Sequence, residues 1–191
     1  MKMQSARSID VHAHAVLPGT MGSAGRYGPE IGSDGAGQPW FRVGEYRLEG
    51  VRYRGSAFMD VDVRLAKMAE AEIEFQILSP NPLTYFHHIE PDLAISYCRQ
   101  HNDELAAVVA KQPQRLAALA ALPMQSPDAA CEELKRAVQE LGMLGACIGS
   151  ELPLPLDSVE LDDFYTALCV RLSRPRMSAR RCPRPPCAGR R

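Results

Sequence analysis

Two histidines near the N-terminus have the type and the spacing of metal ligands. His12 and His14 stand in "IDVHAHA", directly behind a short apolar run. Because side chains alternate between the faces of an extended strand, both imidazoles point the same way, and Asp10 falls on that face too. A carboxylate there can orient an imidazole or lie close to a metal.

The pair predicts half of a divalent metal site. Divalent ions bind clustered imidazole and carboxylate groups. The alternative interpretation is that both are ordinary surface or core histidines. Zinc and related ions take at least three protein ligands, so further ligands must come from distant sequence.

Length and composition predict one globular domain. The chain has 191 residues, 46% of them hydrophobic, which is enough to bury a sizeable core. No apolar run has the length of a membrane span, and the N-terminus lacks the apolar segment of a signal peptide, so we expect a cytoplasmic protein with no membrane partner. The six cysteines form no C-x-x-C pair, which favours reduced thiols.

The near-neutral net charge of −1 hides an uneven distribution. Residues 171–191 contain eight Arg and no Asp or Glu, whereas residues 1–170 carry 14 Lys or Arg against 23 Asp or Glu. An acidic body therefore carries a basic tail.

Strand and helix patterns alternate along the body. A first strand at 8–14 precedes a Gly- and aromatic-rich stretch, 17–57, that we interpret as a long irregular insertion. Strands are then expected at 75–79, 115–123 and 144–150, and helices at 60–71, 91–112, 127–141 (capped by Ser126) and 161–172. This order predicts a parallel sheet with helices outside, either an open doubly wound sheet or an eight-stranded barrel.

The order and spacing of several motifs make the resemblance to one family specific. "IDVHAH", "DVDVRLAKMAEAEIEFQILSPNP", "HNDELAAVVAKQPQRLAALAALPMQSPDAACEELKRAVQELG" and "GACIGS" resemble the amidohydrolase-related, aminocarboxymuconate semialdehyde decarboxylase-like family over about residues 8–172. That family is a metal-dependent (β/α)8 TIM barrel. The resemblance implies an α/β domain at 1–172 that is the N-terminal half of such a barrel, with about four βα units, followed by a disordered tail at 173–191.

The resemblance also implies a metal centre and a reaction. His12 and His14 match two metal ligands of the family, and the implied cofactor is a divalent ion, zinc or else manganese. The implied function is non-oxidative decarboxylation of an unsaturated or aromatic carboxylic acid, with hydrolysis by the same fold as the alternative. The family's ligands from the fifth and eighth strands and its catalytic histidine from the sixth have no counterpart here, so we assign no catalytic residue.

Four further residues are substrate-binding candidates by the same resemblance. Arg52 lies twelve residues before Arg64, as does the arginine that holds the substrate carboxylate in related decarboxylases; Arg54 is its rival, and a solvated loop arginine is the alternative. Tyr85 and Phe86 follow the second strand and could wall the pocket, or pack their loop against the barrel.

The composition changes abruptly after Leu172, where Arg, Pro, Ser and Cys replace the helical pattern. We interpret residues 173–191 as the out-of-frame end of a truncated gene product, which alone has no catalytic activity. A basic arm that binds polyanions is the alternative, although we expect a small carboxylic acid and no nucleic acid as the partner. Unpaired strand edges would favour pairing with another copy of the chain.

Overall fold

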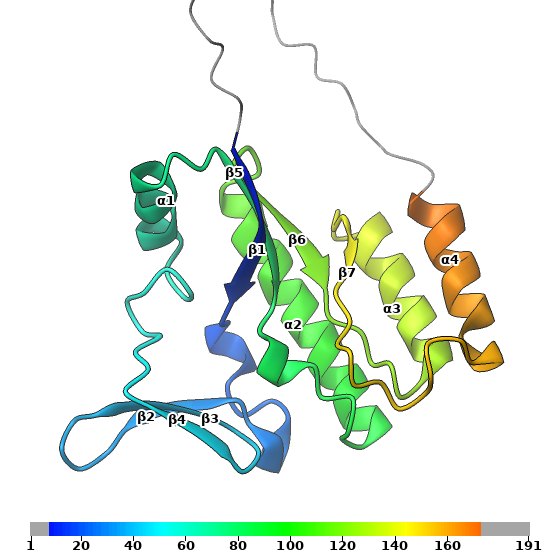
Figure 1. Cartoon of the computed structure of the whole chain (residues 1–191), viewed down its shortest axis with the longest axis horizontal. Coiled ribbons are helices and arrows are strands. Elements are labelled where there is room, and N and C mark those ends of the chain that lie inside the picture. The colour runs from blue at the N-terminus through cyan, green and yellow to red at the C-terminus, as the bar shows by residue number, and fades with distance from the viewer. Residues whose placement is uncertain (1–7, 173–191) are drawn as a thin grey trace, which may run out of the picture.

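The chain folds around a parallel sheet whose strands alternate with helices (Figure 1). The structure, a computed structural model, describes residues 8–172, so the predicted disordered tail lies outside the described residues. The strands are β1 (Ile9–Ala15), β5 (Phe75–Pro80), β6 (Leu116–Ala120) and β7 (Gly145–Ala146); the helices are α1 (Val61–Glu70), α2 (Pro91–Lys111), α3 (Pro127–Gln139) and α4 (Asp162–Leu172). The strands lie side by side in the order β1-β5-β6-β7, and each neighbouring pair is parallel, which confirms the α/β prediction.

Local sequence signals account for the helix starts. The Asp60 side chain accepts hydrogen bonds from the backbone N–H groups of Asp62 and Val63, which caps α1. Helices α2 and α3 each begin with proline, whose missing N–H costs nothing in the first turn. Ser126 is the N-cap residue of α3, as predicted, but its side chain makes no capping hydrogen bond.

The insertion is not irregular, contrary to the sequence prediction. Between β1 and α1 the chain forms β2 (Glu30–Ser33), β3 (Pro39–Val43) and β4 (Tyr46–Glu49), an antiparallel sheet of three strands in the order β2-β3-β4. Figure 1 shows this small sheet beyond the carboxyl ends of the parallel strands, the end toward which the arrowheads of β1 and β6 point. Strands of four or five residues separated by Gly-containing turns are too short to show a clear alternation.

The fourth parallel strand is shorter than predicted. Only Gly145 and Ala146 pair with β6, and the Cys147 N–H extends the ladder by one bond to the Ala120 carbonyl, at 2.9 Å. After Cys147 the chain leaves the ladder. The Cys147 side chain contacts the loop after β5, where its Sγ lies 3.1 Å from the Tyr85 hydroxyl.

Two hydrophobic cores hold these layers together. The first lies between the parallel sheet and its helices and includes Leu78, Leu105 and Leu134. The second lies beneath the small sheet and includes Phe41 and Tyr97. Helix α2 contributes to both cores, so it joins the small sheet to the parallel one.

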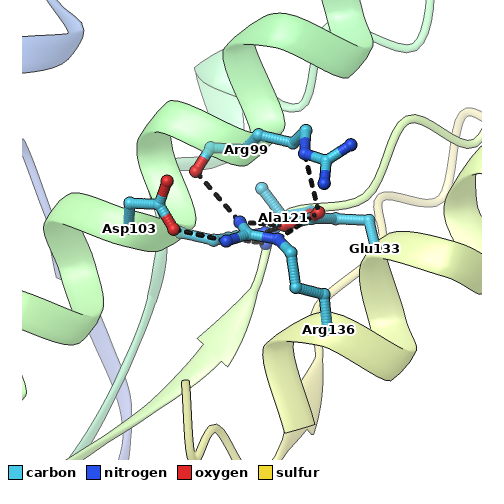
Figure 2. A network of polar contacts seen from close by, with 6 residues as sticks. Arg99, Asp103, Ala121, Glu133 and Arg136 are labelled. Atoms are coloured by element: carbon cyan, nitrogen blue, oxygen red, sulfur yellow. Dashed lines mark hydrogen bonds and ion pairs between the residues drawn. The ribbon is translucent and has the colours of Figure 1, made fainter. Parts of the chain in front are cut away.

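A buried polar network fixes α2 and α3 to the carboxyl end of β6 (Figure 2). The fully buried Asn102 amide accepts a bond from the Ala121 N–H (2.8 Å) and donates to the Ala121 carbonyl (2.9 Å) and to the Glu133 carboxylate (2.7 Å). Arg136 donates two bonds of 2.8 Å to the buried Glu133 carboxylate and also pairs with Asp103. The buried amide of Asn102 and the buried carboxylate of Glu133 are therefore both compensated by hydrogen bonds, as burial requires.

Replacement of Asn102 should destabilise the protein strongly. Asn102→Ala leaves both backbone groups of Ala121 without their partner and removes one of the two hydrogen bonds to the Glu133 Oε1, which costs about 3 kcal/mol in the free energy of unfolding. Urea unfolding measures the loss. Asp103→Asn is the control, because the Asp103 carboxylate is exposed and its ion pair contributes less than about 1 kcal/mol. Equal losses for the two variants would contradict the role given to Asn102.

The buried His101 predicts a pH-dependent stability. Burial lowers the pKa of His101 to about 4, below the value of about 6.5 for an exposed histidine. Since the unfolded chain then binds the proton more tightly, the free energy of unfolding is highest above about pH 6.5 and falls by up to about 3 kcal/mol as the pH drops toward 4. His101→Gln should reduce this dependence in urea titrations at several pH values. It should not abolish it, because burial also lowers the pKa of His87 to about 4.

Candidate functional site

His12 and His14 lie together at the carboxyl end of β1. Their ring centroids are 5.0 Å apart at an interplanar angle of 73°. Ala13 and Ala15 point the other way into the first core, which places the two imidazoles on the opposite side of the strand. The register of β1 against β5 shifts between Asp10 and Ala13, and the histidine pair keeps a common side despite that shift.

Hydrogen bonds on one ring nitrogen prepare His14 to bind a cation. Its Nδ1 lies 2.9 Å from the Ser79 Oγ and 3.1 Å from the Pro80 carbonyl oxygen. Because a carbonyl can only accept, Nδ1 carries the hydrogen and Nε2 keeps a free lone pair, the arrangement found in metal-bound histidines. Burial and, to a lesser extent, the neighbouring His12 lower the pKa of His14, which keeps the ring neutral as a ligand must be.

A chain of polar side chains supports the strand that carries the pair. The two Asp10 oxygens accept bonds from the His12 N–H (2.9 Å) and the Gln76 amide (2.7 Å), and these bonds lower the pKa of Asp10. Gln76 in turn accepts from Arg64 (2.7 Å), whose other Nη donates to the His14 carbonyl (2.7 Å). Asp10 therefore holds the backbone of β1, and neither of these two bonds reaches an imidazole. Sequence reasoning missed Gln76 and Arg64; a glutamine inside an apolar strand is the signal that could have indicated a buried partner.

The two imidazoles fit a divalent ion, but they form only part of a metal site. Two imidazoles on one side, one of them with its tautomer set, suit zinc or manganese. Among residues 8–172, however, no group of three or more His, Cys, Asp or Glu side chains could hold a metal ion.

Arg52 and Arg54 lie in a different place from the histidines. Both line a cavity of about 450 Å³ between the small sheet and the segment that follows it, together with Trp40. Neither His12 nor His14 lines this cavity. The structure therefore brings the two arginines together but does not join them to the histidine pair in one cavity.

The loop after β5 contains the other two candidates. The Tyr85 ring is half-buried and stacks on His87, with centroids 5.6 Å apart and planes 2° from parallel. Burial and the Cys147 contact raise the pKa of Tyr85. Phe86 is only 2% exposed and packs edge-on against Tyr97 in the second core, so its ring faces the interior.

Sequence reasoning did not foresee the contacts between Tyr85, His87 and the segment after β7. The Gly149 N–H donates a long bond of 3.4 Å to the His87 Nε2, and a Cβ at Gly149 would press against the Tyr85 ring. The sequence carried no signal for this juxtaposition, since the residues are about 60 positions apart and the fold alone joins them.

Comparisons with known proteins agree with this geometry. Residues 9–175 match the amidohydrolase family. The gamma-resorcylate decarboxylase of Rhodococcus jostii (strain RHA1) is 49% identical over 87 residues, which are 46% of this chain and 26% of that protein. The 2-amino-3-carboxymuconate-6-semialdehyde decarboxylase of Dictyostelium discoideum is 34% identical over 93 residues, 49% of this chain and 26% of that protein.

A solved structure extends the likeness to the fold. The dihydroxybenzoic acid decarboxylase of Polaromonas sp. JS666, crystallised with manganese and the inhibitor 2-nitroresorcinol, superposes with a TM-score of 0.63 at 28% identity. The likeness covers 86% of this chain and 46% of that one. The chain thus spans less than half the length of this relative, which is consistent with a partial barrel.

Metal binding by the histidine pair should be real but weak. With two imidazoles and no third ligand among the described residues, zinc should bind with a Kd that is roughly micromolar or weaker, far from the affinity of a complete site. Titration calorimetry gives the affinity. In NMR spectra, Mn²⁺ should broaden the ring signals of His12 and His14 and spare those of the exposed His88.

Matched variants test the assignment of these ligands. His12→Ala and His14→Ala should each remove most of the zinc heat, whereas His88→Ala should leave it unchanged. A tight equimolar complex, or one that survives both ligand variants, would contradict this view of the site.

Proposed function

Because the chain belongs to the amidohydrolase family, we propose that it forms the metal-binding half of a non-oxidative decarboxylase of an aromatic or unsaturated carboxylic acid. The histidine pair at the carboxyl end of β1 carries this proposal, since barrel enzymes place their reacting groups at that end. Similarity to two decarboxylases of unsaturated or aromatic acids supports the choice of reaction within the fold.

His12 and His14 would hold the divalent ion, for which we propose zinc, with manganese as the alternative found in the Polaromonas relative. Such an ion supplies Lewis acidity and acidifies bound water. The residues of this chain set the ligand geometry: Pro80 and Ser79 orient His14, and Asp10 holds the backbone of His12. Decarboxylation of this kind needs no redox partner or organic cofactor.

For the substrate carboxylate we propose Arg52 or Arg54, whose planar guanidinium groups suit bidentate binding. Tyr85 remains a candidate wall residue, because its ring is half-buried near the carboxyl end of the sheet. The buried Phe86 could contribute only if its loop moved.

Hydrolysis by the same fold is the second candidate reaction, since fold alone does not separate the two. Within residues 8–172 no helix is long and apolar enough to cross a membrane. The cytoplasmic location and self-association proposed from the sequence remain predictions.

The chain alone should release no CO2. Purified protein loaded with zinc or manganese is incubated with 2,6-dihydroxybenzoate and with aminocarboxymuconate semialdehyde, and CO2 is measured. We expect none, because the pair lacks the remaining ligands among the described residues. Turnover by the chain alone that His12→Ala abolishes would contradict this expectation.

Fusion to the remaining half of a relative tests the proposed reaction itself. Joined to the unmatched C-terminal part of the Rhodococcus decarboxylase, the chain should release CO2 in a metal-dependent way, and His12→Ala should abolish this release. Hydrolysis of a lactone or amide by the folded fusion, without CO2 release from either acid, would favour the hydrolase instead.

A further inference from the structure

The parallel sheet has one face in the core and one face that is only partly covered. Along β5 and β6 the buried side chains, such as Leu78 and Ala118, belong to the first core, to which all four helices contribute. The apolar residues that alternate with them, Ile77, Ala117 and Leu119, are only half-buried and are part of neither core. We call this second side of the sheet the open face.

The histidine pair lies at the carboxyl end of the open face. Ser79 follows Ile77 by two residues along β5, so both side chains point to the same side of the sheet. The Ser79 Oγ contacts the His14 Nδ1 at 2.9 Å, and the His12 ring lies against that of His14. The two candidate metal ligands therefore stand beside an apolar surface.

Both outer edges of the sheet lack a strand partner among residues 8–172. Strand β1 pairs only with β5, and β7 pairs only with β6. Proteins commonly block such edges with lysine or proline, and neither residue occurs in β1 or β7. Ile9 and Val11 on β1 are 57% and 66% exposed, Leu144 before β7 is 49% exposed, and the Asp10 carboxylate is turned inward to Gln76.

A second copy of the chain has the strands that these edges lack. Two sheets of four parallel strands, related by a two-fold axis, would close into a ring of eight in which β1 of each copy pairs with β7 of the other. Ile9, Val11 and Leu144 alone expose about 300 Å² of apolar surface per chain, against the roughly 800 Å² that each partner gives to a standard interface, and the open face adds to it.

The same ring brings two histidine pairs together. The two β1 strands would lie four strands apart, directly across the ring, with their carboxyl ends at the same mouth. The interior of an eight-stranded ring is just wide enough for side chains to fill, so side chains from opposite strands meet near its axis. Two copies thus offer four imidazoles, which is the number of ligands that a closed zinc site takes.

We propose that a zinc ion joins two copies of this chain into a closed parallel dimer, with His12 and His14 of both copies as its ligands. The proposal rests on the metal binding proposed above for the pair and adds the source of the missing ligands, which one chain does not supply among its described residues. It concerns assembly and not turnover. A single chain binds zinc weakly, and the second copy completes the site.

Sedimentation velocity of the purified chain tests this assembly, in EDTA and at increasing zinc concentrations. Because zinc binds the dimer better than the single chain, it should tighten the dimer at least about tenfold relative to EDTA. The complex should contain one zinc ion for two chains. By the same linkage, the apparent zinc affinity should rise with the chain concentration, and excess EDTA should return the protein to the distribution seen without zinc.

Variants separate the ligands from the interface. His12→Ala and His14→Ala should each abolish the effect of zinc on dimer formation, whereas His88→Ala should retain it. Leu144→Lys places an ammonium group at the β7 edge and should weaken the zinc-dependent dimer at least about tenfold, yet leave the weak zinc binding of the single chain intact. Tyr46→Lys is the matched control, because Tyr46 is 55% exposed on the small sheet and lies on neither edge of the parallel one.

The outcomes distinguish this proposal from the proposed metal site. One zinc ion per chain with no change in mass would overturn the dimer and leave the histidine pair as a metal site, whereas zinc binding that ignores both histidine variants would contradict both. A dimer unaffected by zinc, or assemblies larger than a dimer, would also overturn the closed ring. So would a zinc-dependent dimer that tolerates Leu144→Lys, because pairing of β1 with β1 would leave the β7 edge unused.

Discussion

The parallel pairing of β1 with β5 is the interaction on which the candidate metal site depends. It places His14 opposite Ser79 and Ala15 opposite Pro80, so that the His14 Nδ1 meets a hydroxyl and a carbonyl of the neighbouring strand. That contact decides which ring nitrogen is left to bind a cation. The hydrogen bonds from Arg64 to Gln76 and from Gln76 to Asp10 then fix the same strand from the side of α1. A slip of one residue between the two strands would remove all of these contacts at once.

The parts of the fold that the sequence predicted are those with a strong local signal. The four helices and the order of the parallel strands follow from apolar periodicity and from proline at helix starts. The His12 and His14 pair follows from alternation in a strand. Asp10 was recognised beside the pair, but its bonds to the His12 backbone and to Gln76 were not. Arg64 from α1 and Gln76 from β5 were missed, because only the tertiary fold brings these elements together behind β1.

The small sheet of the insertion between β1 and α1 was not predicted, because its local sequence signal is weak. Its three short strands left too weak a pattern to be recognised, and so the cavity that they build was not foreseen either. The Gly- and aromatic-rich composition placed Arg52 and Arg54 in an irregular insertion, and the family resemblance led us to expect them at a substrate pocket. Their actual surroundings depend on Trp40, which the hairpin between β2 and β3 brings beside them.

Helix α2 couples the two sheets, because it contributes side chains to both hydrophobic cores. It spans 21 residues, a length of about 30 Å, and its first half places Tyr97 and Cys98 in the core under the small sheet, while Leu105 enters the core of the parallel sheet. Fraying of this one helix would therefore open both cores. The insertion and the half-barrel consequently belong to a single cooperative unit, whose amide hydrogens along α2 exchange with solvent only when both layers come apart together.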